Sequence, residues 1–139
     1  MKKSVLIIVL VFLGNIALAQ EVGLKIDGLV QPKKTTTVLL NSSNLETVTI
    51  TTPRGQSMQA QVFVVSRNQD TMSPHLVNAI NKGVYFKSML LFNRLPDGKT
   101  VINKLSKVIL SNYSSNSSSG QAPTETFYIQ FFTNDMTVK

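Results

Sequence analysis

Apolar and polar residues alternate along most of this chain, the pattern that half-buried β-strands produce. Turn-forming residues separate the alternating stretches, among them Pro53-Arg54-Gly55, Asp97-Gly98 and the run Asn41-Ser42-Ser43-Asn44. Residues 112–120 contain five serines and are predicted to form a loop. The pattern predicts strands over residues 22–27, 35–40, 45–52, 58–66, 84–92, 100–110 and 125–132.

Only one segment has the periodicity of a helix. Ser73 is a suitable N-cap, and Pro74 fits the first helical position because no N–H is needed there. Gly83 stands where a left-handed residue would end the helix. The apolar stripe between these ends consists of Leu76, Ala79 and Ile80.

These elements predict a mainly β protein, a small antiparallel β-barrel or sandwich of six to eight strands with one short α-helix. Several strands carry apolar residues on both faces, as where Tyr128 and Phe132 alternate with Phe127 and Ile129. One face would fill the core, and the other needs a cover. Neighbouring copies of the chain would supply that cover, and the alternative is the chain's own helix and loops.

The first residues have the features of a secretory leader. Lys2 and Lys3 precede the apolar run of residues 5–13, and Ala17-Leu18-Ala19 has the small residues that a signal peptidase reads. The competing interpretation, a membrane anchor, needs about 20 apolar residues. We therefore expect a cleavable signal peptide over residues 1–19, a single domain over residues 20–139, and no stable membrane insertion after cleavage.

The composition limits the kinds of chemistry that this chain can carry out. Of 139 residues, 14 are Lys or Arg and 7 are Asp or Glu, so the formal charge is +7, and removing Lys2 and Lys3 leaves +5. The basic residues are scattered apart from Lys33-Lys34, which argues against a nucleic-acid surface. Cysteine is absent, and the single histidine, His75, lies in the predicted first helical turn with no nucleophile motif elsewhere.

The acidic residues are isolated along the chain and form no metal-loop or paired-carboxylate pattern. We therefore expect no enzyme, no cofactor, no metal, and no catalytic or ligand residue that can be named from the sequence. The acidic residues are Glu21, Asp27, Glu46, Asp70, Asp97, Glu125 and Asp135.

Three segments, in order, resemble a known family. Residues 72–89 resemble the Ser-Pro-x-Leu helix and following strand of the haemolysin-coregulated proteins (Hcp), which form the tube of the bacterial type VI secretion system. Leu24-Lys25-Ile26-Asp27-Gly28 is similar to their first strand, and residues 123–129 resemble their Pro-Thr-Glu strand. The resemblance spans most of residues 22–134.

The resemblance implies a barrel-like fold whose copies close into a hexameric ring, with rings stacked head to tail into a tube. It implies no enzymatic activity; the partners would be the protein itself, effector proteins in the lumen, and sheath or spike components. Two features depart from the family: the signal peptide, which predicts a periplasmic or extracellular protein of a Gram-negative bacterium, and the absence of Trp. A secreted monomeric β-barrel binding module therefore remains the alternative.

Overall fold

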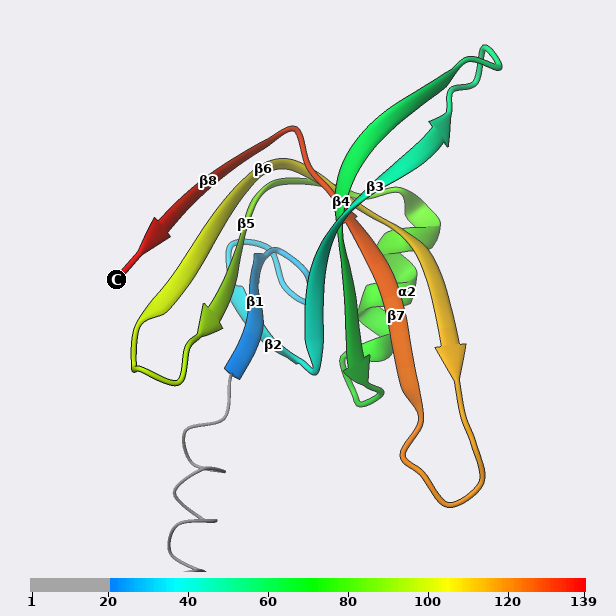
Figure 1. Cartoon of the computed structure of the whole chain (residues 1–139). Coiled ribbons are helices and arrows are strands. Elements are labelled where there is room, and N and C mark those ends of the chain that lie inside the picture. Colours follow the sequence, from blue (N-terminus) through cyan, green and yellow to red (C-terminus); the bar gives the residue numbers. More distant parts are fainter. Residues whose placement is uncertain (1–20) are drawn as a thin grey trace, which may run out of the picture.

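A computed structural model describes residues 21–139 as one antiparallel sheet of eight strands with one helix (Figure 1). The predicted signal peptide, residues 1–19, lies outside the described residues. The elements are β1 (Glu21–Asp27), β2 (Thr35–Leu40), β3 (Ser42–Thr51), β4 (Ser57–Asn68), α2 (Ser73–Lys82), β5 (Tyr85–Arg94), β6 (Thr100–Asn116), β7 (Thr124–Gln130) and β8 (Thr133–Val138).

The sheet curls so that its two end strands come together at one corner. The strand order is β2-β1-β5-β6-β7-β4-β3, with β8 added on β6. The end strands β2 and β3 are consecutive in the chain and separated only by Asn41, whose N–H donates to the Ser66 carbonyl at 2.7 Å. No ladder joins β2 to β3 or β4, so the sheet is barrel-like but not closed. This confirms the predicted fold class.

One face of the curled sheet encloses the core, and α2 lies against it (Figure 1). Leu76 and Ala79 of the predicted helical stripe are buried there, and Ile80 packs against the core from its margin. The strands contribute alternate residues, so the predicted period of two is confirmed over most of the sheet. No helix within residues 21–139 is long and apolar enough to span a bilayer.

The two ends of α2 differ in how well the sequence predicted them. Gly83 has φ 63°, and its N–H donates to the Ile80 carbonyl at 3.2 Å, which confirms the predicted left-handed end. At the other end the prediction was wrong: the N-cap residue is Met72, and Ser73 is the first helical residue. The Ser73 hydroxyl instead donates to the Glu125 carboxylate at 2.9 Å and accepts from the Asp70 N–H at 3.0 Å. A hydrogen bond to a charged carboxylate is stronger than one between neutral groups.

Three strand boundaries also differ from the predictions. The expected turn over residues 41–44 is mostly strand, since β3 already pairs with β4 at Ser42. The serine-rich segment remains in β6 as far as Asn116, because its backbone pairs with β7 across a bulge that includes Asn112 (φ 57°). The expected strand over residues 125–132 ends at Gln130, and β8, which the pattern did not predict, follows it.

The β3–β4 hairpin projects away from the body of the protein (Figure 1). Residues 57–61 of β4 pair only with β3. The residues of one hairpin face are apolar, whereas threonine, serine and glutamine occupy the other. The apolar side chains are Val48, Ile50, Met58 and Ala60.

Candidate self-association surface

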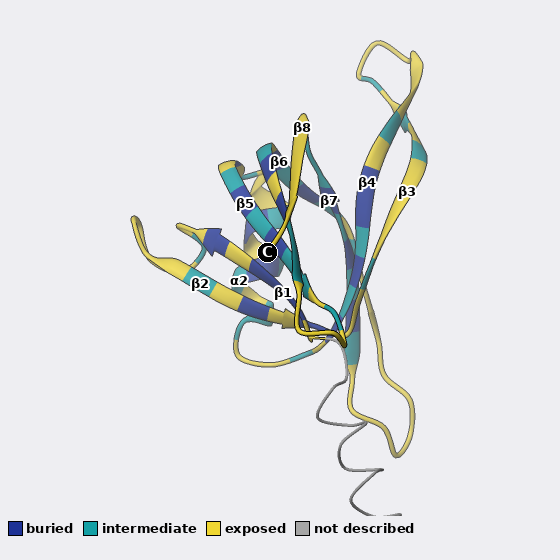
Figure 2. Ribbon diagram, turned by 60° about the vertical axis from the view of Figure 1, so that its left-hand side comes forward, coloured by how far each residue is buried: buried dark blue, intermediate teal, exposed yellow. Residues whose placement is uncertain are grey.

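Strand β8 lies outside the body of the molecule. All six of its residues are exposed, and Figure 2 shows it as exposed along its length. It pairs only with the first half of β6, so its outer edge has no partner strand within residues 21–139. A free strand edge of this kind presents unpaired N–H and C=O groups to any other strand that approaches.

Two apolar side chains of β8 are uncovered on the side of the sheet that elsewhere forms the core. Met136 pairs in register with the buried Asn103, and Val138 pairs with Val101. Met136 is nevertheless 63% exposed and Val138 58% exposed, because the core does not extend beneath β8. Covering such side chains is worth roughly 25 cal/mol per Å² of apolar surface.

A second free edge lies at the other side of the same group of strands. Strand β2 pairs only with β1, and Leu39 on it is 59% exposed. Around the first half of β6 the local order is β2-β1-β5-β6-β8, so β2 and β8 are the two edges of a five-stranded sheet. The two edges differ in sequence, which suits a head-to-tail contact between copies.

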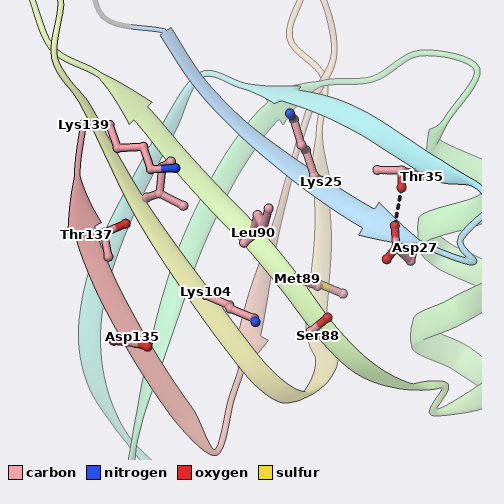
Figure 3. A pocket seen from close by; sticks show the side chains of 11 residues that line it. Lys25, Asp27, Thr35, Ser88, Met89, Leu90, Lys104, Asp135, Thr137 and Lys139 are labelled. Atoms are coloured by element: carbon pink, nitrogen blue, oxygen red, sulfur yellow. Dashed lines mark hydrogen bonds between the residues drawn. The ribbon is translucent and has the colours of Figure 1, made fainter.

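The face of these strands that points away from the core has a hollow of about 610 Å³ (Figure 3). Half-buried Leu90 and Ile102 line it together with Lys25 of β1 and Lys104 of β6. Asp135 of β8 pairs in register with Lys104, so the hollow carries both signs of charge. Its surface is mixed polar and apolar and holds no concentrated catalytic group.

The most extensive polar cluster is buried between α2 and the sheet. Arg67 of β4 is 2% exposed, and its Nη1 donates to Glu125 Oε2 of β7, whose side chain is fully buried. Tyr113 of β6 donates to Glu125 Oε1 at 2.7 Å, while Arg67 Nη2 lies 2.6 Å from Asp70 Oδ1. Together with Ser73, these residues fix the beginning of α2 against β4, β6 and β7.

The cluster shifts two ionisation equilibria. The hydrogen bond from Arg67 is the main reason that the pKa of Asp70 lies below its ordinary value, with a further contribution from the Met72 N–H. Desolvation, and then the hydrogen bond to Glu125, raises the pKa of Tyr113 to about 12. Both shifts favour the charge states that hold the cluster together at neutral pH, so the cluster is a structural element.

The histidine and most of the acidic residues considered in the sequence remain apart. His75 lies on α2 and lines a shallow depression with Pro74 and Asn78. Within residues 21–139 no three His, Asp or Glu side chains come close enough to hold a metal ion. Asp70 and Glu125 are brought together by Arg67. This pairing could not be predicted from the sequence, because residues 67 and 125 are 58 positions apart in the chain.

Comparison with solved structures identifies the fold. One structure of a type six secretion system protein matches with a TM-score of 0.65 at 19% identity, covering 85% of this chain and 83% of that one. Hcp1 from Salmonella typhimurium gives 0.63 at 16% identity, covering 86% and 93%. The secreted protein Hcp3 from Pseudomonas aeruginosa gives 0.55 at 12% identity, covering 87% and 97%.

The chain therefore has the fold of type VI secretion system proteins. More particularly, over most of its length it has the fold of the Hcp proteins, which confirms the resemblance predicted from residues 24–28, 72–89 and 123–129. No protein-family model matches the sequence, and no curated protein matches it.

Proposed function

We propose that this protein is a structural, self-assembling tube subunit of the Hcp kind, whose copies close into a ring, with a hexamer as the expected ring, and whose rings stack. The observation that carries the proposal is the uncovered strand β8, with Met136 and Val138 exposed beside an unpaired edge. The similarity of fold to Hcp proteins supports it. The role needs no catalytic residue, metal or cofactor.

In the proposed ring, β8 of one copy lies beside β2 of the next, so that their five-stranded sheets continue from subunit to subunit. This contact uses two different surfaces of the same chain, which is the requirement for a ring that closes by rotation. It covers Met136 and Val138 and gives the free edge of β8 hydrogen-bond partners. The side of the sheet that carries the hollow then faces the lumen of the ring. Effector proteins would be carried in this lumen, and sheath and spike components are the further partners.

The proposed working domain is residues 20–139, exported after cleavage of residues 1–19 and acting in the periplasm or outside the cell. N-terminal mass analysis of the protein recovered from culture fractions tests this part directly. A mature chain that begins at Gln20 is the expected result. An intact Met1 on the exported protein contradicts the cleavage.

Ring formation is tested by mass photometry and negative-stain electron microscopy of the protein at micromolar concentration. Rings of constant diameter are expected for the wild type. Met136→Lys places a charge in the proposed contact and should give monomers, whereas Thr137→Lys, on the opposite face of the same strand, is the matched control and should still form rings. A wild-type protein that stays monomeric at these concentrations contradicts the proposal.

The second candidate is a monomeric β-barrel binding module, and the observation that favours it is the hollow of about 610 Å³. Its size is within the range of small-molecule pockets. Under this alternative the wild type and Met136→Lys are equally monomeric. The same mass measurement therefore separates the two functions.

A further inference from the structure

Three neighbouring strands lose their alternation at the same level of the sheet. In β5, the buried Phe86 and Met89 are separated by two residues, Lys87 and Ser88, that face outward. In β6, the buried Leu105 and Val108 are separated in the same way.

The third interruption is the junction of β7 and β8. Phe131 packs against the core there, and both Phe132 and Thr133 are exposed. The ladder register of β6 against β7 continues unchanged into β8, so the two strands are one strand with an interruption. The register places this interruption beside the one in β6, where the Phe132 N–H donates to the Ser106 carbonyl at 2.9 Å.

These interruptions form one crease across the sheet and collect a distinct set of side chains on its outer side. Lys87 and Lys107 lie next to each other between the pairs Phe86–Val108 and Ser88–Ser106, where the ladder omits one pair. The crease surface, as we define it, consists of Tyr85, Lys87, Lys107, Ile109 and Phe132.

The crease surface is both apolar and positively charged. Phe132 is 74% exposed and Tyr85 64% exposed, values unusual for aromatic side chains of a folded domain. The Lys107 ammonium lies 4.9 Å from the centre of the Phe132 ring. Lys107 also has φ 54°, a left-handed conformation that residues other than glycine seldom adopt, so the fold holds this lysine in place at a conformational cost.

No carboxylate belongs to the crease surface, and a second copy of this chain offers no acidic counterpart. Outside the buried Arg67 cluster, no two acidic residues are neighbours: Glu21 and Asp27 lie at opposite ends of β1, and Glu46, Asp97 and Asp135 lie on other segments. Three of these carboxylates already have partners within the chain. Asp27 accepts a hydrogen bond from the Thr35 hydroxyl, Glu21 forms an ion pair with Arg94, and Asp97 accepts a hydrogen bond from the Lys99 N–H. The carboxylates that pair with Lys87 and Lys107 must therefore come from a different protein.

We propose that the crease surface binds an acidic segment of a different protein, with two carboxylates flanking an apolar or aromatic side chain. The three strands span about 10 Å, which matches one face of a helix or an extended segment. Nucleic acid fits less well, because two lysines neutralise too few phosphates for appreciable affinity at physiological salt. The proposal does not depend on ring formation.

The test uses a fluorescein-labelled helical peptide with glutamates at positions i and i+4 around a leucine. Anisotropy measures binding to the full-length protein, and backbone amide NMR shifts locate it. The expected result is saturable binding with shifts at residues 85–88, 106–109 and 130–133. The matching peptide with glutamine in place of glutamate should bind at least about tenfold more weakly, since the charge contacts are lost.

Two crease variants and one control complete the experiment. Lys87→Glu with Lys107→Glu should weaken binding at least about tenfold. Lys107→Gly removes one ammonium group and suits the left-handed backbone, so weaker binding by this variant cannot be attributed to misfolding. Lys25→Glu with Lys104→Glu alters the same number of charges in the hollow and should leave binding unchanged.

Several results overturn the proposal. It is overturned if the crease variants bind the peptide as tightly as the wild type does. It is also overturned if the crease and hollow variants lose the same amount of affinity, or if the wild type does not bind the peptide at millimolar concentration. If amide NMR shifts at the crease change with protein concentration when no peptide is present, the surface binds a second copy of the chain instead. Equal binding of the glutamine and glutamate peptides also overturns it. DNA or anionic vesicles that displace the glutamate peptide replace the acidic segment by a general polyanion.

Discussion

Removing Glu125 should be the most destabilising single change in the buried cluster, and removing Arg67 with it should recover most of the loss. Glu125→Leu leaves the Arg67 guanidinium buried, at 2% exposure, with only Asp70 as a carboxylate partner. Breaking a buried ion pair from one side costs about 3–5 kcal/mol. That is a large fraction of a total stability of about 5–15 kcal/mol.

The double variant Glu125→Leu with Arg67→Met replaces the pair by apolar groups of similar size. Its stability should lie within about 1–2 kcal/mol of the wild type, because no buried charge then lacks a partner. Arg67→Met alone should cost less than Glu125→Leu, since Ser73 and Tyr113 still donate to the carboxylate.

Urea unfolding followed by circular dichroism measures these differences, in a Met136→Lys background so that association does not contribute. With a denaturant slope of about 2 kcal/mol/M, Glu125→Leu should lower the midpoint by roughly 1.5–2.5 M. The reasoning is refuted if the double variant is as unstable as Glu125→Leu, or if Glu125→Leu costs less than about 1 kcal/mol.

Three further predictions concern single positions. Folding raises the pKa of Tyr113 from 10.0 to about 12, so its protonated hydroxyl stabilises the folded state. This contribution is complete below pH 10 and is lost as the pH rises toward 12. Tyr113→Phe should remove this alkaline decline from the pH profile of the free energy of unfolding, and a variant that keeps the full decline contradicts the assignment. Gly83→Ala should cost about 1 kcal/mol or more in thermal unfolding, because φ is 63° there, and an unchanged melting temperature would argue against a left-handed helix end. Gly23→Val should cost about 1–3 kcal/mol, since its Cβ would meet the Phe92 ring; Phe92→Ala should relieve part of that cost, and no relief would place the strain elsewhere.

The sequence was informative where side-chain patterning decides the structure. The helix end at Gly83 and the reversal at Asp97-Gly98, where φ of Gly98 is 88°, follow from local backbone requirements. The mainly β fold with one helix follows from the alternation of apolar residues. In each case the information lies within a few residues of the feature that it determines.

The pattern failed where distant backbone pairing decides the structure. Strand β8 has no buried side chain, and only its ladder with β6 makes it a strand. Ser73 is a residue type that favours the N-cap position, but its hydroxyl donates a hydrogen bond to Glu125, which lies 52 residues away in the chain. The crease needs three strands to be in register, a relation that no single segment contains.

The position of β7 in the sheet has a consequence for the order in which the molecule can fold. Although Thr124–Gln130 is the next-to-last strand in the chain, it lies in the middle of the sheet and is the strand that joins β6 to β4. Before it is in place, β2-β1-β5-β6 and β3-β4 are separate sheets without a shared ladder. During synthesis the core therefore cannot be completed until nearly the whole chain is available, so folding must be late and dominated by long-range contacts.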